Sequence, residues 1–244
     1  MKLPRISFFS RLLDVLFPRL CTVCGNRLMV TEQVLCTTCN YHLPRTDFVR
    51  SPKDNYMARL LWGRIPIAHC AALFYYENHS QATRIIRDLK YNGHPEIGEL
   101  MGQMTAEEFS CLSTSPDGRS ASFFDGISLL IPVPLAKSRQ RERGYNQSEE
   151  IARGVSRVTG LPVVTNAVRR ISFHASQTSL GKWERNENVE KAFELVDASR
   201  IEGQHILLID DVMTTGATMV ACAKELLKAR NVRLSVLTLG FAKG

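Results

Sequence analysis

The sequence predicts an α/β protein in which helices flank a parallel sheet, preceded by a small cysteine-rich module. Four consecutive apolar residues at 206–209 are typical of a strand that is buried on both faces. An apolar pattern of helical period at 219–227 and a second apolar run at 234–239 complete a unit of strand, loop, helix and strand. Two Cys-x-x-Cys pairs near the N-terminus predict the additional module.

The chain has 244 residues, of which 44% are hydrophobic and 23% are charged, as in an ordinary globular protein. This length suffices for one full domain and a small module. No run approaches the roughly 20 apolar residues of a membrane-spanning helix, so the sequence predicts no transmembrane segment. The formal net charge of +7 favours anionic partners, whether nucleic acid, small phosphates or an acidic membrane surface.

The predicted domain boundaries follow changes in composition. Residues 1–50 combine an amphipathic N-terminal segment with the cysteine-rich module, residues 51–66 form a proline-containing linker, and residues 67–244 form the main domain. Arg11 and Asp14 interrupt the apolar cluster of the N-terminal segment, and no small-residue cleavage site follows, so we do not expect a signal peptide. This segment either packs on protein or associates with a membrane.

Apolar runs predict further strands and helices in the main domain. The strands are 69–76, 127–134 and 161–164, and the helices are 80–91, 97–109 and one that begins near Asn146. The prolines at 132 and 134 confine the end of their strand to a sheet edge or a turn. Residues 113–122 have almost no apolar side chains, which predicts a mobile surface loop.

The two cysteine pairs are Cys21 with Cys24 and Cys36 with Cys39, separated by eleven residues. Each pair can place two sulfur atoms on one metal ion, so together they predict a tetrahedral structural Zn²⁺ site. Four protein ligands leave no coordination position open for chemistry. The alternatives are reduced thiols or disulfides, and disulfides are disfavoured when no export signal is found.

Carboxylates, hydroxyls and a glycine directly follow the first predicted strand. Thr214, Thr215 and Gly216 open the next helix, where unpaired backbone N–H groups and the helix dipole suit a phosphate group. Asp210 and Asp211 would repel a phosphate, so they suit sugar hydroxyls or Mg²⁺ at the carboxyl end of the sheet. The predicted ligand is therefore a phosphorylated sugar with a divalent cation. The alternative is that these are ordinary strand-end and N-cap residues.

Four cationic side chains precede the helix that is predicted to begin near Asn146. They are Lys137, Arg139, Arg141 and Arg143. Because cations and a helix N-terminus both attract anions, this segment predicts a site for a diphosphate. The alternative is a solvated basic loop without a ligand.

The segment 173–193 is rich in polar side chains and has no strong periodicity until its end. Its position between two predicted core strands is typical of a loop that closes over a substrate. Gln177, Arg185 and Asn188 are its candidate ligand contacts.

The motif DDVMTTGAT at 210–218 resembles the phosphoribosyl pyrophosphate (PRPP) binding loop of the type I phosphoribosyltransferases. The resemblance implies the parallel sheet of that family, with Mg²⁺ accompanying PRPP. It also implies that Asp210 and Asp211 contact the ribose hydroxyls. The 5′-phosphate would be held by the residues that follow, namely Met213, Thr214, Thr215, Gly216, Ala217 and Thr218.

Other motifs extend this resemblance over most of the chain. In order they are LKYNG at 89–93, IPVPL at 131–135, RERGYNQ at 141–147 and SQTSLGKWERNENV at 176–189. Together with the N-terminal cysteine pairs, they resemble the ComF (ComFC) family of competence-associated phosphoribosyltransferase-like proteins. The resemblance implies a cytoplasmic protein, brought to the membrane through its partners. It would handle incoming single-stranded DNA together with other competence proteins.

Two functional hypotheses follow from these observations. In the first, the protein binds PRPP and is a phosphoribosyltransferase, in which the carboxylates stabilise an oxocarbenium-like sugar and Mg²⁺ assists departure of the diphosphate. In the second, the protein is a non-catalytic adaptor that holds single-stranded DNA by its charge and by exposed aromatic residues such as Tyr145 and Trp183. No motif identifies an acceptor substrate or a catalytic residue.

Overall fold

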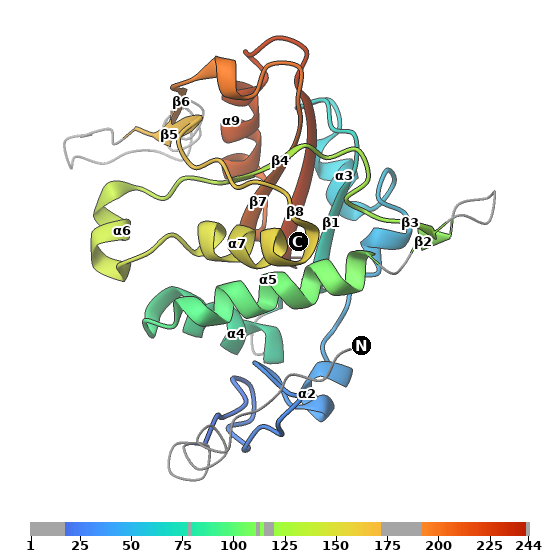
Figure 1. Cartoon of the computed structure of the whole chain (residues 1–244), viewed down its shortest axis with the longest axis vertical. Coiled ribbons are helices and arrows are strands. Elements are labelled where there is room, and N and C mark those ends of the chain that lie inside the picture. Colours follow the sequence, from blue (N-terminus) through green and yellow to red (C-terminus); the bar gives the residue numbers. More distant parts are fainter. Residues whose placement is uncertain (1–17, 78–79, 111–112, 115–119, 172–191, 243–244) are drawn as a thin grey trace. The chain divides into compact units, whose positions relative to one another are not determined.

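The computed structural model describes residues 18–77, 80–110, 113–114, 120–171 and 192–242 (Figure 1). The chain divides into two compact units, Met1–Leu43 and Pro44–Gly244. The division falls immediately before Pro44, so the predicted linker at 51–66 lies inside the larger unit. Each unit is described separately.

The larger unit is organised around one sheet of four parallel strands (Figure 1). The order across the sheet is β1 (Cys70–Tyr75), β8 (Arg233–Phe241), β7 (His205–Met213) and β4 (Leu129–Pro132). Every side chain of residues 206–209 in the inner strand β7 is fully buried. This burial requires protein on both faces of the sheet, as the unbroken apolar run predicts. The predicted α/β fold with a parallel sheet is confirmed.

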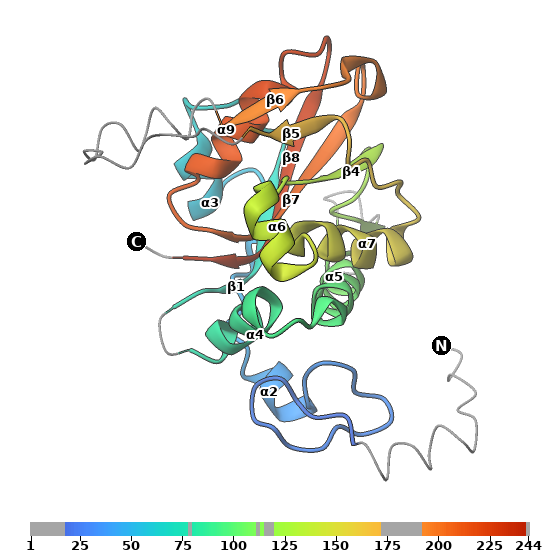
Figure 2. The ribbon, with the colours of Figure 1, turned by 90° about the vertical axis from the view of Figure 1, so that its left-hand side faces the viewer.

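Helices cover both faces of this sheet (Figures 1 and 2). The helix α7 (Gln147–Thr159) packs on β4 and β7, with α5 (Pro95–Ser110) and α4 (Gln81–Tyr91) beyond it. The helices α9 (Ala217–Leu226) and α3 (Tyr56–Leu61) contact the sheet at β7 and β1.

Two glycines allow α5 and α7 to cross at close range. A Cβ atom at Gly154 of α7 would collide with the carbonyl oxygen of Glu99, and one at Gly102 of α5 would collide with that of Ile151. Glycine is therefore the only residue that both positions accept at this separation of the helices. The close crossing holds α7, whose N-terminus faces the site described below, firmly against the rest of the unit.

The segment predicted to be a linker folds as part of the larger unit. It contains α3 and follows the short helix η1 (Phe48–Arg50). Asn55 caps α3, since its Oδ1 accepts from Ala58 N at 2.9 Å while its Nδ2 donates to Cys70 O of β1 at 3.0 Å. Three side chains of α3 are fully buried: Met57, Ala58 and Leu61. The linker prediction is wrong because these few apolar residues, spaced for one helix face, are hidden among polar ones.

Two other elements differ from their predictions. The basic segment 137–143 is a helix of its own, α6 (Lys137–Arg143), rather than a loop. It ends at Gly144, whose φ of 83° lies in the left-handed region that favours glycine. The strand β7 runs on through both carboxylates, and Asp210 pairs with Thr238 of β8. The two aspartates are thus held by the sheet itself.

Irregular segments of the chain form backbone hydrogen bonds with the outer edges of the two outer strands, β4 and β1. Beside β4, Leu130 N donates to Pro162 O and Val164 N donates to Leu130 O, each at 2.9 Å, so the strand predicted at 161–164 is a single bridge. Beside β1, Tyr75 N donates to Pro44 O at 2.7 Å.

Two small antiparallel ribbons complete the larger unit. The first pairs β2 (Ser113–Thr114) with β3 (Ser120–Ala121), within the segment predicted to be a mobile loop. The second pairs β5 (Val168–Arg170) with β6 (Phe193–Leu195), and η2 (Ala198–Arg200) follows it.

The part of the smaller unit that the structure describes, from residue 18, contains a short helix, α2 (Thr37–Tyr41), and an isolated bridge between Leu20 and Arg27. Cys36 caps α2. The amphipathic helix predicted within the first 17 residues lies outside the described residues. Within the described parts of the chain, every helix is too short or too polar to cross a membrane.

Candidate functional site

A cleft of about 380 Å³ opens at the carboxyl ends of β4 and β7. Residues from the sheet, from α4, from the start of α7 and from β5 line it. Its polar or aromatic side chains are Tyr76, Lys90, Tyr91, Arg139, Arg143, Asn146, Gln147, Ser148, Arg170, Asp210, Asp211, Thr214 and Thr218. Open parallel sheets bind ligands at this end, so the cleft is the candidate functional site.

The two predicted carboxylates both line the cleft and have different partners. Asp211 Oδ2 forms an ion pair with Lys90 Nζ at 3.0 Å. Asp210 Oδ1 accepts from Ser148 Oγ at 2.8 Å and from Asp211 N at 2.9 Å. Burial of its carboxyl group, and then the charge of Asp211, raise the pKa of Asp210, although the bond from Ser148 opposes this shift. The carboxyl groups of Asp210 and Asp211 can therefore share one proton, and a cation that binds to them would displace it.

The segment 213–218, called the phosphate loop below, joins β7 to α9. Among the described residues, no acceptor is bonded to the backbone N–H groups of Thr214, Thr215 and Gly216. Gly216 has a φ of 73°, in the left-handed region, and serves as the N-cap of α9. A pocket of about 60 Å³ is enclosed by this loop and its neighbours. Consecutive unbonded N–H groups at the positive end of a helix form an anion-binding pocket.

Only two of the four cations predicted at 137–143 reach the cleft. Arg139 and Arg143 line it, whereas Lys137 and Arg141 do not. The two residues of each pair are four apart, so once the segment is helical they share one helix face. The Arg143 guanidinium lies over the ring of Tyr91, 5.2 Å from its centroid.

The start of α7 presents a further donor to the cleft. Asn146 caps the helix, accepting from Ser148 N at 3.2 Å, and its Nδ2 donates to Val133 O at 3.1 Å. Gln147 is 2% exposed, and its Nε2 has no hydrogen-bond partner within the described part of the chain. A buried donor without a partner is costly, so Gln147 Nε2 is available to a water molecule or to a ligand atom in the cleft.

Of the remaining two cations of the cleft, the sequence favours a solvated helix face for Lys90, with a phosphate contact as the alternative, and gives no role to Arg170. Lys90 lies in the last turn of α4 and pairs with Asp211, and Arg170 is the last residue of β5. Burial, and then the charge of Arg139, lower the pKa of Arg170, while Asp210 opposes this shift. No local motif marks Arg170, because only the fold brings β5 beside the cleft. The motif LKYNG contains Lys90 and could have identified it.

Three predicted contacts, Gln177, Arg185 and Asn188, lie outside the described residues and remain predictions. The described residues give the cleft four cations, from Lys90 and three arginines, against two carboxylates. A net positive cleft with a carboxylate pair suits a polyanion that also carries hydroxyl groups or a metal ion.

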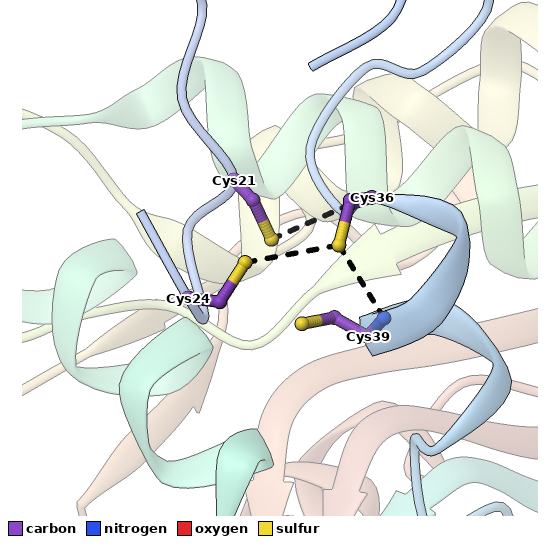
Figure 3. Close-up of side chains that lie close together, drawn as sticks. All are labelled: Cys21, Cys24, Cys36 and Cys39. Carbon is purple, nitrogen blue, oxygen red and sulfur yellow. Dashed lines mark hydrogen bonds between the residues drawn. The ribbon is translucent and has the colours of Figure 1, made fainter. Parts of the chain in front are cut away.

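The four predicted metal ligands lie together in the smaller unit (Figure 3). The sulfur atoms of Cys21, Cys24, Cys36 and Cys39 all lie within 4.8 Å of one another. The sulfurs of Cys24 and Cys36 are 3.7 Å apart, whereas a disulfide bond measures about 2.05 Å. Tetrahedral Zn–S bonds of about 2.3 Å place sulfur atoms about 3.8 Å apart, so the cluster fits such an ion.

Backbone donors favour negative charge on this cluster. Cys36 N donates to Cys21 Sγ at 3.3 Å, and Cys39 N donates to Cys36 Sγ at 3.5 Å. Burial raises the pKa of Cys21, but the backbone N–H groups of Cys24, Cys36 and Val23 outweigh it and lower that pKa to about 7. Burial and the neighbouring sulfurs raise the pKa of Cys39. A bound cation would favour the thiolate form of these cysteines, since metal ligands are deprotonated.

Known proteins agree with this description of the larger unit. Residues 114–241, just over half of the chain, match the phosphoribosyl transferase domain. The chain therefore belongs to the family of proteins with a phosphoribosyltransferase domain.

Three relatives narrow the family further. Competence protein F of Haemophilus influenzae is 37% identical over 100 residues, covering 41% of this chain and 44% of that protein. Competence protein ComFC of Bacillus subtilis is 37% identical over 112 residues, covering 46% and 43%. The DNA utilization protein YhgH of Escherichia coli K12 is 26% identical over 215 residues, covering 86% and 84%. Within the phosphoribosyltransferase domain proteins, this chain is a member of the ComF family.

Proposed function

We propose that the protein binds PRPP with Mg²⁺ in the cleft at the carboxyl end of its sheet. The observation that carries this proposal is the meeting of a carboxylate pair, three unbonded loop N–H groups and four cations in one place. PRPP combines a ribose, a phosphate monoester and a diphosphate. Each of these groups has a matching set of residues.

The phosphate loop would hold the 5′-phosphate through Thr214, Thr215, Gly216 and the residues up to Thr218. Asp210 and Asp211 would accept hydrogen bonds from the ribose hydroxyls. The Lys90 ammonium group, now paired with Asp211, would then be free to contact the diphosphate. Binding of PRPP would thus replace the ion pair between Lys90 and Asp211 with one between Lys90 and the diphosphate.

The diphosphate would lie at the start of α7. Arg139 and Arg143 supply charge there, and Gln147 Nε2 supplies the donor that lacks a partner. Mg²⁺ would neutralise part of the diphosphate charge, and the carboxylates and phosphate oxygens of the cleft are the hard ligands that it prefers. The same arrangement suits transfer of the phosphoribosyl group, because the carboxylates stabilise the positive charge that develops on the sugar as diphosphate leaves.

Calorimetric titration of PRPP with Mg²⁺ into the purified protein tests this function. We expect saturable binding, weakened about tenfold or more in Asp210→Asn and in Asp211→Asn, because each loses a charged acceptor. Asp54→Asn is the matched control, since Asp54 is exposed and pairs with Arg59 outside the cleft. Unchanged affinity in both cleft variants would exclude this assignment of the carboxylates.

We further propose that this ligand site serves the uptake or processing of DNA in the cytoplasm, with single-stranded DNA and other competence proteins as partners. The printed names of the relatives, competence and DNA utilization proteins, support this role. The second candidate is a non-catalytic adaptor that places a DNA phosphate in the same cleft, favoured by the four cations there and by the net charge of +7. DNA binding that weakens with salt and that PRPP displaces would support the adaptor, whereas simultaneous binding of both would exclude a shared cleft.

We propose Zn²⁺ as the structural ion of the smaller unit. A chelator should remove one equivalent of Zn²⁺ and unfold this unit, because the ionised thiolates would repel one another without the cation. The thermal unfolding of the larger unit should stay unchanged. Loss of both units in one cooperative step on chelation would contradict this independence.

A further inference from the structure

The connection between α3 and β1 lies against the phosphate loop. Arg64, which follows α3, donates from its Nη1 to Thr215 O at 2.7 Å and to Leu60 O of α3 at 3.2 Å. Arg64 comes from the segment that the sequence predicts as a linker, and it precedes residues 114–241, which match the family domain. A side chain from outside the matched region thus bonds directly to the loop proposed to hold phosphate.

The contact between the two segments is close. A Cβ atom at Gly216 would lie 3.4 Å from Arg64 Nη1 and 3.5 Å from Leu61 Cδ2. Leu61 is fully buried, so α3 is anchored in the core beside the loop. Arg64 itself is exposed, so its guanidinium is held beside the loop by its two carbonyl bonds, three residues after the anchored Leu61.

Peptide geometry gives this contact a consequence for ligand binding. In a trans peptide, the carbonyl oxygen of one residue and the N–H of the next point in opposite directions. When Arg64 holds the Thr215 carbonyl, it fixes the direction of the Gly216 N–H. That N–H has no acceptor within the described residues, and the bond from Arg64 to the Thr215 carbonyl holds it pointing away from the guanidinium.

Arg64 also brings charge to the loop. Within the described residues it has no carboxylate at ion-pair distance, and a guanidinium has donors beyond the one that Thr215 uses. We propose that Arg64 is the positioning residue of the phosphate loop and makes the loop selective for a phosphate monoester. This inference rests on the proposed binding of PRPP. It assigns the segment 51–66, through Arg64, a role in positioning the loop that binds this ligand.

Arg59 of α3 provides a matched control. It carries the same charge on the helix that directly precedes Arg64, but it pairs with Asp54 at 2.9 Å and lies over the ring of Tyr56. Removing it changes the net charge by the same amount without touching the loop. A difference between Arg64→Gln and Arg59→Gln therefore reports the contact with Thr215.

The experiment compares these variants and Arg64→Lys by calorimetry with three probes in Mg²⁺ buffer: PRPP, ribose 5-phosphate and inorganic pyrophosphate. We expect Arg64→Gln to weaken PRPP and ribose 5-phosphate about tenfold, because a charge-assisted bond and an aligned donor are lost. Pyrophosphate binding should not change. Arg64→Lys, which keeps the charge, should fall between the wild type and Arg64→Gln.

A second measurement follows the ligand-free protein. We expect NMR order parameters of the Thr215 and Gly216 amides to fall in Arg64→Gln and to stay unchanged in Arg59→Gln. Equal order parameters in the wild type and Arg64→Gln would overturn the positioning role. Equal loss of ribose 5-phosphate and pyrophosphate affinity would overturn the selectivity. If the wild type binds no PRPP, the proposed function fails, and the order parameters still decide whether Arg64 positions the loop.

Discussion

The polar groups at the two ends of the sheet differ in whether they have hydrogen-bond partners. At the carboxyl end, the N–H groups of the phosphate loop and the Gln147 amide lack partners within the described residues. At the amino end, His205 Nε2 contacts Ser235 Oγ at 2.8 Å, and that hydroxyl contacts His69 Nδ1 at 3.2 Å. Both imidazoles also bond to backbone carbonyls. Buried polar groups are normally satisfied, so the end that leaves them unsatisfied is the end that binds.

The amino end also shows how its network limits protonation. His205 Nδ1 contacts Gly126 O and His69 Nε2 contacts Phe123 O, each at 3.0 Å, so these nitrogens carry the ring protons. Both remaining ring nitrogens then face the single proton of Ser235. The shorter contact assigns that proton to His205. Burial lowers the pKa of both histidines, so the network stays neutral at physiological pH.

The largest expected effect is the loss of stability in His205→Ala. This change should reduce the free energy of unfolding by about 2–4 kcal/mol, because it opens a cavity, leaves the Gly126 carbonyl without its ring donor and removes the shorter of the two contacts of Ser235. Urea denaturation measures this loss. PRPP affinity of the folded variant should equal that of the wild type, and a large drop in affinity would show that the two ends are coupled.

The next largest effect is the pH dependence that arises at the amino end. Burial, and then His205, lower the pKa of His69 to about 4, below its unfolded value of about 6.5. The unfolded chain therefore binds more protons between these values, and stability falls as pH decreases from 6.5 toward 4. We expect a loss of about 2 kcal/mol, allowing for the partial exposure of His69. Urea denaturation of His69→Gln over this range should show a shallower slope.

The carboxyl end should respond to pH with the opposite sign. The pKa of Asp210 is raised above its unfolded value, so the native state holds the extra proton and stability falls as pH increases through that window. Asp210→Asn should therefore be more stable than the wild type by about 1 kcal/mol at pH 8, while its PRPP affinity is lower. Thermal unfolding at pH 5 and pH 8 measures this contribution. If Asp210→Asn were destabilised to the same extent at pH 5 and pH 8, the proposed contribution of the Asp210 proton would be contradicted.

The smallest expected effect concerns Ser148→Ala. Its hydroxyl donates to Asp210, which lowers the pKa of that carboxyl group, so the variant should raise it further. PRPP affinity should fall about threefold at pH 6.5 and recover at pH 8.5, when Asp210 is ionised in both proteins. Calorimetry at pH 6.5 and pH 8.5 distinguishes this effect on protonation from a loss of packing. A loss of packing would weaken PRPP binding at pH 8.5 as well.

Much of the fold could be predicted because its signals are local. An unbroken apolar run defines β7, helical periodicity defines α9, and paired cysteines define the cluster in the smaller unit. Asp210 and the phosphate loop are contiguous in sequence, so their placement in one region followed directly. The sequence could not place Arg170 at the cleft, nor show that the Gln147 amide is buried there without a partner. Both facts depend on which segments the tertiary structure brings together.

The helix α6 shows how one local error affects the prediction of a site. As a loop, the segment 137–143 could bring all four cations to a ligand. As a helix, it presents Arg139 and Arg143 to the cleft and turns Lys137 and Arg141 away. The linker error had the opposite effect, since it removed α3 and Arg64 from the predicted domain. Short helices rich in charged residues are the elements that periodicity identifies least well.

The paired outer edges of the sheet have a consequence for the protein at high concentration. An exposed strand edge offers free N–H and C=O groups on which a second chain can add as a new strand, which is a common route to aggregation. Here Pro162 and Val164 already bond to β4, and Pro44 bonds to β1. The prolines also lack the N–H group that such an addition would need. Within the described residues, backbone of the same chain thus already occupies part of each outer edge, which disfavours the addition of a second copy there.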